Sequence, residues 1–339
     1  ANGVYYDDYG IDGLRCDFGQ GLPPQFWEYI VNRTRAVKWN FMFMAESLDG
    51  GKVSYRSNRH FDILNESFVF QMVGAGSPGD VKNAVESRKN LYAGGAVLLN
   101  LTSHDEVMPY SDPWTTASRF AMVSSMMGLP MTFYGQEQGI VPCEADKTGH
   151  SAGDTVDGNA YSGFAKFELN MGKWVAHFKN WNKLLVWEDP PSATWSRQMA
   201  QWYGRVNWAR LNSPALQSGN QYFLGRKHEG TYDNGKIFAV AKVEESGAVA
   251  KGKDAVLAFA LFVNVGEGGH AGANDTYDLA ACWDLLGLTN SAGVYYNVRN
   301  LASGAAQTAL WPTPKSGAEL YNDGIWVSFD SDGGGRAIY

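Results

Sequence analysis

The sequence predicts an α/β fold, in which βα units build a parallel sheet, followed by a separate antiparallel β domain. From Ile11 to about Ser218, short apolar runs alternate with longer amphipathic runs, which is typical of βα units. Beyond that point strand-like runs follow one another, separated by Gly, Asn, Asp and Ser. The length of 339 residues, 45% of them apolar, is enough for about two domains. We therefore expect domains over residues 1–218 and 219–339.

The first domain has five candidate strands, each followed by a loop and a plausible helix. They are Gly13–Asp17, Phe41–Glu46, Phe61–Leu64, Ala96–Leu101 and Met131–Tyr134. A helix is predicted from Pro24, because proline is favourable at the first helical position. Another is predicted between Asp112 as N-cap and Gly128 as the stop.

The second domain is predicted from four strand-like runs without a convincing helix between them. The runs are "IFAVAKVE", "AVLAFALFVNV", "VYYNVRNL" and "GIWVSFD". The glycine-rich stretch "DSDGGGRAIY" predicts a turn and a last strand rather than a phosphate loop, since no strand and helix flank it in the required order.

Composition excludes several classes of function. The net charge of −7 and the lack of a basic run argue against a nucleic-acid partner. No apolar run approaches the ~20 residues that span a bilayer, so no membrane partner is expected. Cys16, Cys143 and Cys282 lie far apart without CxxC spacing, which gives no sign of a zinc site. The 12 tryptophans and 17 tyrosines suggest, weakly, a carbohydrate ligand.

Charged and polar side chains gather at the carboxyl ends of the predicted strands. Parallel βα structures place this end at the active site. The first strand supplies Arg15 and Asp17, the second Glu46, and the loop just past the fourth supplies His104 and Asp105. Three carboxylates held together would repel one another, and a neighbouring arginine offsets part of that cost. The pattern indicates an enzyme that works with carboxyl groups.

Glycoside hydrolysis needs this kind of cluster. One ionised carboxylate attacks the anomeric carbon while a protonated carboxyl donates its proton to the leaving oxygen. A third carboxylate can bind substrate hydroxyls and stabilise the positively charged transition state.

Four stretches in order carry a resemblance to a known family. "GIDGLRCD", "FMFMAESLDG", "LLNLTSHDE" and "GLPMTFYGQE" resemble the strand-four, strand-five, strand-seven and strand-eight signatures of the α-amylase family of glycoside hydrolases. The resemblance implies a (β/α)8 TIM barrel, of which this chain supplies about strands 4–8, followed by an antiparallel β-sandwich domain.

The same resemblance implies a role for each matching residue. Asp17 matches the nucleophile, Glu46 the general acid/base and Asp105 the transition-state stabiliser. Arg15 matches the residue that holds the nucleophile ionised and oriented, and His104 the one that binds the sugar in the cleavage subsite. The family retains anomeric configuration, so the first two carboxyls are expected roughly 5 to 5.5 Å apart.

The function expected from the resemblance is retaining hydrolysis of α-1,4-glucosidic bonds in starch, glycogen or maltooligosaccharides. One alternative keeps the site and changes the acceptor, which gives an α-glucan transglycosylase. Another alternative is a non-catalytic glucan-binding protein on a degenerate barrel. An exported enzyme, secreted or held in the cell envelope, would suit such polymeric substrates.

The family's barrel has three βα units before the strand-four signature, which here begins near residue 10. We therefore expect this chain to be the C-terminal part of a longer polypeptide or to pair with a second chain that supplies the missing N-terminal barrel portion. No cofactor is required for the chemistry. Gln20 and Gly21 stand where many members have a Lys-His pair, whose histidine helps to bind calcium, so a structural calcium ion stays an open alternative.

Other residues near the predicted site have a structural explanation. Glu137 is expected to support a loop, and Tyr55, Tyr110 and Trp114 are expected to pack rather than to stack on sugar. Strand alternation points Cys16 away from Arg15 and Asp17, toward the helices.

Overall fold

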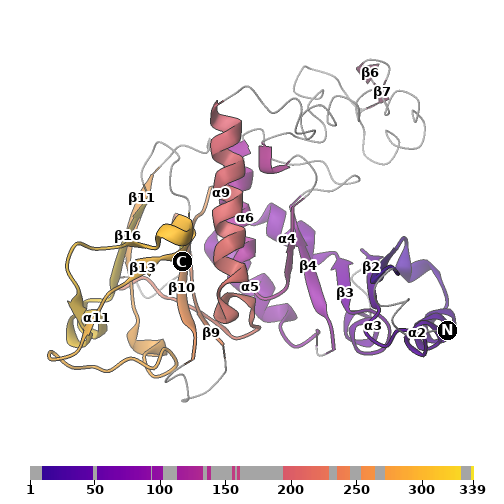
Figure 1. Cartoon of the computed structure of the whole chain (residues 1–339), viewed down its shortest axis with the longest axis horizontal. Coiled ribbons are helices and arrows are strands. Elements are labelled where there is room, and N and C mark those ends of the chain that lie inside the picture. The colour runs from indigo at the N-terminus through magenta and orange to yellow at the C-terminus, as the bar shows by residue number, and fades with distance from the viewer. Residues whose placement is uncertain are drawn as a thin grey trace. The chain divides into compact units, whose positions relative to one another are not determined.

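A computed structural model of the chain describes residues 10–48, 52–92, 94–101, 113–132, 136–138, 155–156, 159–160, 194–228, 235–244, 253–263, 272–329 and 337–339 (Figure 1). The chain divides into two compact units. The first comprises residues 1–75, 80–99 and 127–130, and the second comprises residues 76–79, 100–126 and 131–339. The predicted domain boundary near residue 218 stays a prediction.

A five-stranded sheet forms the centre of the first unit, with its strands in sequence order. The strands are β1 (Gly13–Cys16), β2 (Met42–Ser47), β3 (Ile63–Glu66), β4 (Ala96–Asn100) and β5 (Leu129–Met131). Strands β1 to β4 pair in parallel, with Arg15 opposite Met44 and Glu46 opposite Asn65. The first four predicted strands are confirmed with shifts of one or two residues at their ends, whereas β5 shares only Met131 with the fifth predicted strand.

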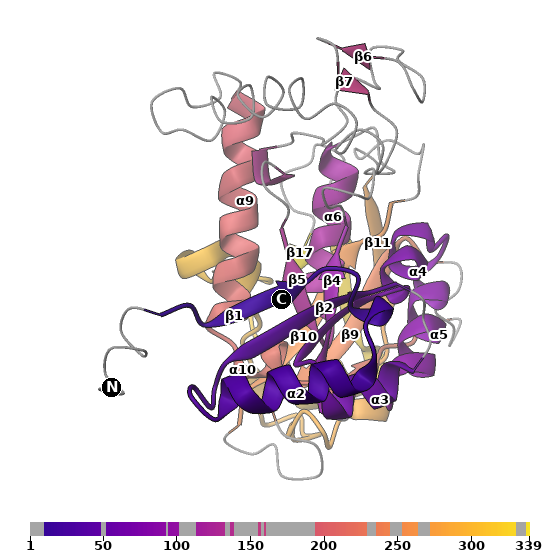
Figure 2. The ribbon, with the colours of Figure 1, turned by 90° about the vertical axis from the view of Figure 1, so that its right-hand side faces the viewer.

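Helices connect these strands. They are α2 (Pro24–Arg35), α3 (Val53–Arg59), α4 (Phe68–Gly74) and α5 (Pro78–Arg88), and a short 3-10 turn, η1 (Gly19–Gly21), follows β1. Helix α2 begins at Pro24 as predicted and buries Trp27 and Val31, whereas Phe26 and Tyr29 on its other faces are exposed. Figure 2 shows α2 and α3 together with β1 and β2.

At two glycines of the family-like stretches, Gly13 and Gly128, the space around the backbone leaves no room for a side chain. A Cβ at Gly13 would lie 2.7 Å from the carbonyl oxygen of Met42, because β1 and β2 approach closely there. Gly128 has a φ of +123°, and a Cβ would lie 2.8 Å from the Val97 carbonyl oxygen. A side chain at either position would collide with backbone, so glycine fits where the sheet is tightest.

Strand β1 has one partner, β2, among the described residues, and several exposed apolar residues belong to β1 and to the segment that leads into β2. The amide of Met42 donates to the Asp12 carbonyl (2.9 Å), and the buried Lys38 ammonium bonds the Ile11 carbonyl and the Asp12 carboxylate. These bonds hold the loop before β2 against the start of β1. We call the exposed group here the β1 apolar surface: Ile11, Leu14, Val37, Trp39 and Met42.

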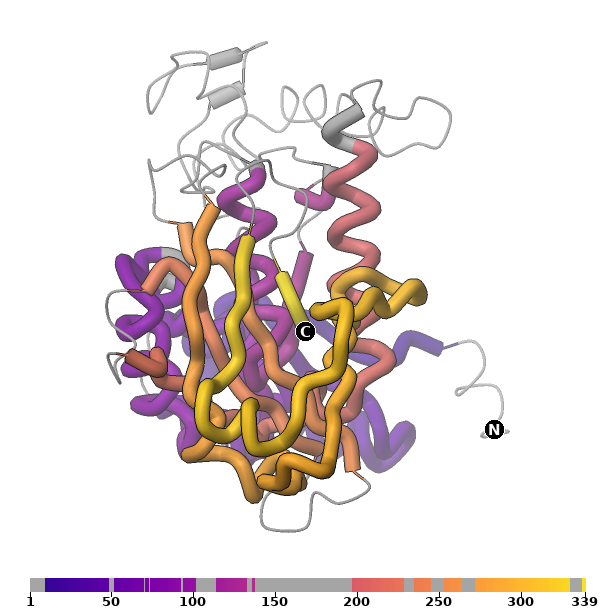
Figure 3. Tube along the Cα trace, turned by 90° about the vertical axis from the view of Figure 1, so that its left-hand side faces the viewer, coloured from indigo at the N-terminus to yellow at the C-terminus, as the bar shows by residue number. Residues whose placement is uncertain are grey.

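The second unit contains helices α6 (Pro113–Ser124), α9 (Thr194–Leu211) and α10 (Pro214–Gln217) and an antiparallel sheet in the order β17-β10-β9-β8. These strands are Gln221–Phe223 (β8), Ile237–Val243 (β9), Ala255–Leu261 (β10) and Ala337–Ile338 (β17). Strands β11 (Ala273–Tyr277) and β16 (Ile325–Phe329) form a second antiparallel pair. Figure 3 shows these strands running side by side.

The remaining elements of this unit are short. They are β6 (Thr155–Val156), β7 (Asn159–Ala160), β12 (Tyr295–Tyr296), β13 (Arg299–Asn300), β14 (Thr308–Ala309), β15 (Lys315–Ser316), the 3-10 turns η2 (Gln136–Gln138), η4 (Ala280–Cys282) and η5 (Leu301–Ala306), and helix α11 (Gly317–Asp323). Helix α11 corrects the expectation that no helix interrupts the β domain. The side chain of Ser316 accepts from the Glu319 amide and that of Glu319 accepts from the Ser316 amide, a capping box that starts this short helix.

One apolar core joins both antiparallel sheets, as a β-sandwich requires; among its members are Phe259, Val327 and Trp283. Helix α6 packs against α9, where the rings of Phe120 and Tyr203 stack 4.5 Å apart. The hydroxyl of Tyr339, next to β17, donates to the carbonyl of Ala121 in α6.

A fully buried lysine lies in β9. The Nζ of Lys242 donates to the carbonyl of Ser218 at 2.6 Å, and burial, with the nearby Arg210 charge, lowers the pKa of Lys242 to about 7. None of the helices in the described part is long and apolar enough to cross a membrane.

Candidate active site

The candidate site lies where β1 and β2 end, on neighbouring parallel strands of the first unit. Arg15 lies within β1, Asp17 lies in the turn just after it, and Glu46 is near the end of β2. Asp17 is open to solvent, with 80% of its side chain exposed, whereas Glu46 is only 16% exposed. The parallel pairing of the two strands brings these three predicted site residues together.

One guanidinium joins the two carboxyls. The Nη1 of Arg15 binds Oδ1 of Asp17, and its Nη2 donates to Oε2 of Glu46 at 3.1 Å. The planar guanidinium presents several donors in a fixed geometry, so it can hold two acceptors at once. Its positive charge offsets the repulsion between two carboxylates held side by side.

Each carboxyl keeps one oxygen without a hydrogen-bond partner among the residues that the structure describes. Both bonds to Glu46 end on Oε2, the second coming from the amide of Phe18 at 3.0 Å, and the bond to Asp17 ends on Oδ1. Within the described part of the chain, Oε1 of Glu46 and Oδ2 of Asp17 therefore face no donor. The arrangement orients both groups and leaves one oxygen of each available to a ligand.

Phe18 is a contributor that the sequence did not identify. Its backbone has a φ of 45° and a ψ of 48°, a left-handed conformation uncommon for a residue with a Cβ. This turn directs the Phe18 amide at Glu46. The only signal in the sequence is the glycine-rich stretch "DFGQG", which indicates a tight turn but not the direction of one amide.

Two further residues hold the loops around the site. The indole Nε1 of Trp27, buried in α2, donates to the Gly19 carbonyl at 2.8 Å and fixes the turn that follows Asp17. The guanidinium of Arg56, in α3, donates to the hydroxyl of Ser47, next to Glu46. Neither was predicted, because their partners come from distant parts of the sequence.

The cysteine between Arg15 and Asp17 is buried, as strand alternation predicted. Burial raises the pKa of the Cys16 thiol, an effect that the nearby Arg15 charge reduces only in part. The thiolate that would react is therefore disfavoured, and Cys16 has a packing role.

Two predicted site residues, His104 and Asp105, lie outside the described residues, as does Tyr110. Glu137 lies in η2, next to Gln136, whose amide donates to the Tyr203 hydroxyl at 3.1 Å. The supporting role expected for Glu137 itself stays a prediction.

Tyr55 packs as expected. Its ring contacts the imidazole of His60 edge-on and its hydroxyl lies 3.3 Å from a carboxylate oxygen of Glu28. In the part of the chain that the structure describes, no three His, Cys, Asp or Glu side chains converge as metal ligands.

No protein-family profile and no curated protein sequence matches the chain. Comparison with solved structures is informative. An α-amylase from Anoxybacillus superposes with a TM-score of 0.57 at 14% sequence identity, over 98% of this chain and 60% of that one. The α-amylase of Geobacillus thermoleovorans, solved with acarbose, gives a TM-score of 0.60 at 12% identity, over 99% of this chain and 61% of that one. The chain has the fold of the α-amylases.

A third solved structure has a similar fold. AmyP, solved in complex with maltose, superposes with a TM-score of 0.60 at 12% identity, over 99% of this chain and 65% of that one. The chain spans about three fifths of the length of these solved structures. Its parallel five-stranded sheet and its antiparallel sheets are consistent with part of a barrel followed by a β domain.

Proposed function

We propose that the chain carries the nucleophile and the general acid/base of a retaining α-glucan hydrolase. The observation that supports this most is the shared guanidinium of Arg15, which holds Asp17 and Glu46 together at the ends of adjacent parallel strands. A glycosidase that retains configuration needs two carboxyls close enough to act on one anomeric carbon from its two faces.

In the proposed mechanism Asp17 attacks the anomeric carbon through Oδ2, the oxygen that Arg15 does not hold. Glu46 carries the proton on Oε1 and passes it to the leaving glycosidic oxygen. In the second step Glu46 takes a proton from water, which then displaces Asp17. Arg15 holds Asp17 in position for the attack and offsets its negative charge, and Asp105 and His104 would bind sugar hydroxyls. These steps need no metal ion.

The proposed substrate is an α-1,4-linked glucan, such as starch, glycogen or a maltooligosaccharide. The solved structures with this fold are named as amylases and as a cyclomaltodextrinase, and AmyP is described in complex with maltose. This support is by fold, since sequence identity is low.

We also propose that further βα units, from the same polypeptide or a second chain, cover the β1 apolar surface. Strand β1 has its second edge without a partner among the described strands, and Trp39, in the segment before β2, is 83% exposed. Open sheet edges and apolar patches of this kind are normally covered.

The test is substitution of the two carboxyls in the complete protein that carries this chain, with maltooligosaccharides as substrate. Asp17→Asn and Glu46→Gln should each lower kcat by at least about a thousandfold, because each removes an essential step. The matched control is Asp284→Asn, which changes an exposed aspartate of the second unit and should keep its activity. Unchanged release of reducing sugar from the Asp17→Asn variant would refute the role of Asp17, whereas a parent protein that binds maltooligosaccharides and releases no reducing sugar would be a glucan-binding protein.

The products distinguish a retaining hydrolase from an inverting hydrolase and from a transglycosylase. A retaining hydrolase releases the α-anomer first, which proton NMR detects before mutarotation. Release of the β-anomer would refute the retaining assignment of Asp17. Accumulation of longer oligosaccharides at high substrate concentration would assign the same site to glycosyl transfer.

A further inference from the structure

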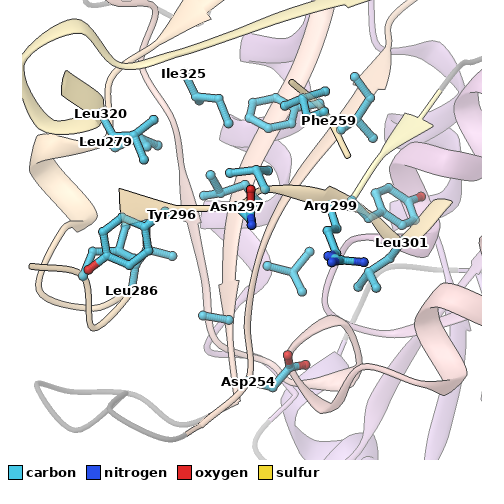
Figure 4. A pocket seen from close by; sticks show the side chains of 18 residues that line it. Asp254, Phe259, Leu279, Leu286, Tyr296, Asn297, Arg299, Leu301, Leu320 and Ile325 are labelled. Atoms are coloured by element: carbon cyan, nitrogen blue, oxygen red, sulfur yellow. The ribbon is translucent and has the colours of Figure 1, made fainter. Parts of the chain in front are cut away.

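A cavity of about 350 Å³ opens in the antiparallel β unit, far along the sequence from Asp17 and Glu46. It lies among strand β10, the segment 296–301 and the loop 279–288 (Figure 4). Its volume falls in the range of small-molecule sites, which starts at roughly 300 Å³. The size is sufficient for a small ligand.

Aliphatic side chains form most of the wall. Leu257, Leu286, Leu288, Val298 and Leu310 are among them. A sugar needs many hydrogen-bonding partners and flat aromatic faces, whereas leucine and valine offer neither. An aliphatic chain, by contrast, gains free energy when it leaves water for such a wall. The wall therefore favours a ligand with a hydrocarbon body.

Some polar groups of the lining already form hydrogen bonds with other protein groups. The carboxylate of Asp254 accepts from the Ser213 hydroxyl (2.5 Å) and the Ala215 amide (3.0 Å). The Tyr296 hydroxyl accepts from the Thr289 amide at 2.7 Å. These groups hold the protein together and have less capacity for a ligand.

Two other polar side chains of the lining are not engaged by any residue in the described part of the chain. Among the described residues, the amide of Asn297 and the guanidinium of Arg299 form no hydrogen bond or ion pair with protein. Figure 4 shows them near one another, between Tyr296 and Leu301, with Asp254 at another side of the cavity. Both offer N–H donors, and Arg299 is the one cation of the described lining. A planar carboxylate is the group that a guanidinium recognises best.

We propose that this cavity binds an aliphatic carboxylate, with its hydrocarbon chain among the leucines and its head group on Arg299 and Asn297. Arg299 is exposed, so the head group lies at the mouth and the chain points inward. The site is separate from the proposed glycosidase site and does not depend on that assignment.

The experiment is calorimetric titration of the full chain with decanoate below its micelle concentration, and with decanol as the uncharged equivalent. Decanoate should bind more tightly than decanol. Arg299→Gln should weaken decanoate binding roughly three- to tenfold, as expected for a solvent-exposed ion pair, and leave decanol binding unchanged. Arg197→Gln, which removes an exposed arginine of α9, is the matched control and should change neither affinity.

A second variant locates the binding. Val298→Phe places a larger side chain into the cavity and should abolish binding of both ligands while the circular dichroism spectrum stays that of the parent. The proposal is overturned if decanoate does not bind, if it binds no better than decanol, or if Val298→Phe leaves its binding intact, which would place it elsewhere, such as on the β1 apolar surface. Displacement of decanoate by maltoheptaose would make the cavity a sugar site and would also overturn it.

Discussion

The Nη2 of Arg15 lies 3.1 Å from Oε2 of Glu46, across the boundary between two neighbouring parallel strands. The same guanidinium binds Asp17, so a single side chain sets the relative position of both carboxyls. Its geometry gives the first prediction.

Arg15→Lys should lower kcat/KM roughly a hundredfold, although the positive charge is kept. An ammonium group has no fork of fixed donors and cannot hold both carboxyls in one geometry. Steady-state kinetics on a maltooligosaccharide would measure the loss, and the pH–rate profile should change shape because both carboxyls have lost a partner. Arg33→Lys on the exposed face of α2 serves as control; equal activity of the two variants would show that the bridge is unnecessary.

Glu66, fully buried at the end of β3, should be among the residues most important for stability. Its carboxylate accepts from the Tyr92 hydroxyl, the Phe68 amide (2.9 Å) and the Ser67 hydroxyl (3.1 Å). Glu66→Ala leaves these donors unpaired, and should lower the free energy of unfolding by about 2 to 4 kcal/mol. Urea titration would measure it.

Glu86, exposed on α5 and paired with Lys89, provides the comparison for Glu66. Glu86→Ala should lower the free energy of unfolding by no more than ~0.5 kcal/mol, as is usual when a surface ion pair is lost. If both substitutions lower the free energy of unfolding equally, the hydrogen bonds of Glu66 do not stabilise β3 against its surroundings.

Stability should rise with pH above neutrality because of Lys242. Its pKa falls from 10.5 to about 7 in the folded state, so the unfolded chain binds one proton more between these values. The penalty for burying the amine is complete below pH 7 and is relieved as the pH rises toward 10.5, at up to about 1 kcal/mol per pH unit. Urea unfolding at pH 7 to 9.5 would show the rise.

Lys242→Met should flatten that dependence, since no amine remains to titrate. The pH range in which stability rises ends near pH 10. Burial raises the pKa values of Tyr203, Tyr277 and Tyr339, so above this pH the tyrosines ionise more readily in the unfolded chain and favour it. A pH dependence in the variant as steep as in the parent would assign the effect to another group.

The β1 apolar surface should make the isolated chain prone to association. A triple replacement, Leu14→Thr, Val37→Lys and Trp39→Ser, should reduce the binding of a hydrophobic fluorescent dye and the light scattering of concentrated solutions. The same number of polar substitutions at the exposed residues Leu211, Val294 and Tyr295 of the other unit is the control. If both triple replacements reduce dye binding and light scattering equally, the β1 apolar surface is not the main site of association.

The sequence predicted the strands of the first unit because each combines an apolar run with polar residues at its end. Arg15, Asp17 and Glu46 lie together because they follow such runs. It did not predict the Phe18 amide, because a left-handed backbone at a residue with a Cβ depends on the surrounding contacts. Helix α11 was missed because seven residues are too few for a helical period to be visible beside strands.

The faces of α2 show a further limit of periodicity. Trp27 and Val31 are buried while Phe26 and Tyr29 are exposed, although all four are apolar or aromatic and belong to one helix. Hydrophobic spacing identifies a helix, but with apolar residues on several faces it does not select the buried one.

The bond between Tyr339 and Ala121 has a consequence for the order of synthesis. The two residues are 218 positions apart, and α6 also packs against β17, which ends just before Tyr339. During translation, α6 leaves the ribosome long before the strand that completes its packing. At ~5 to 20 residues per second the helix waits on the order of ten seconds or more for these contacts. The second unit can therefore complete its fold only after nearly all of its chain has been made, and a chaperone would find the exposed face of α6 during that interval.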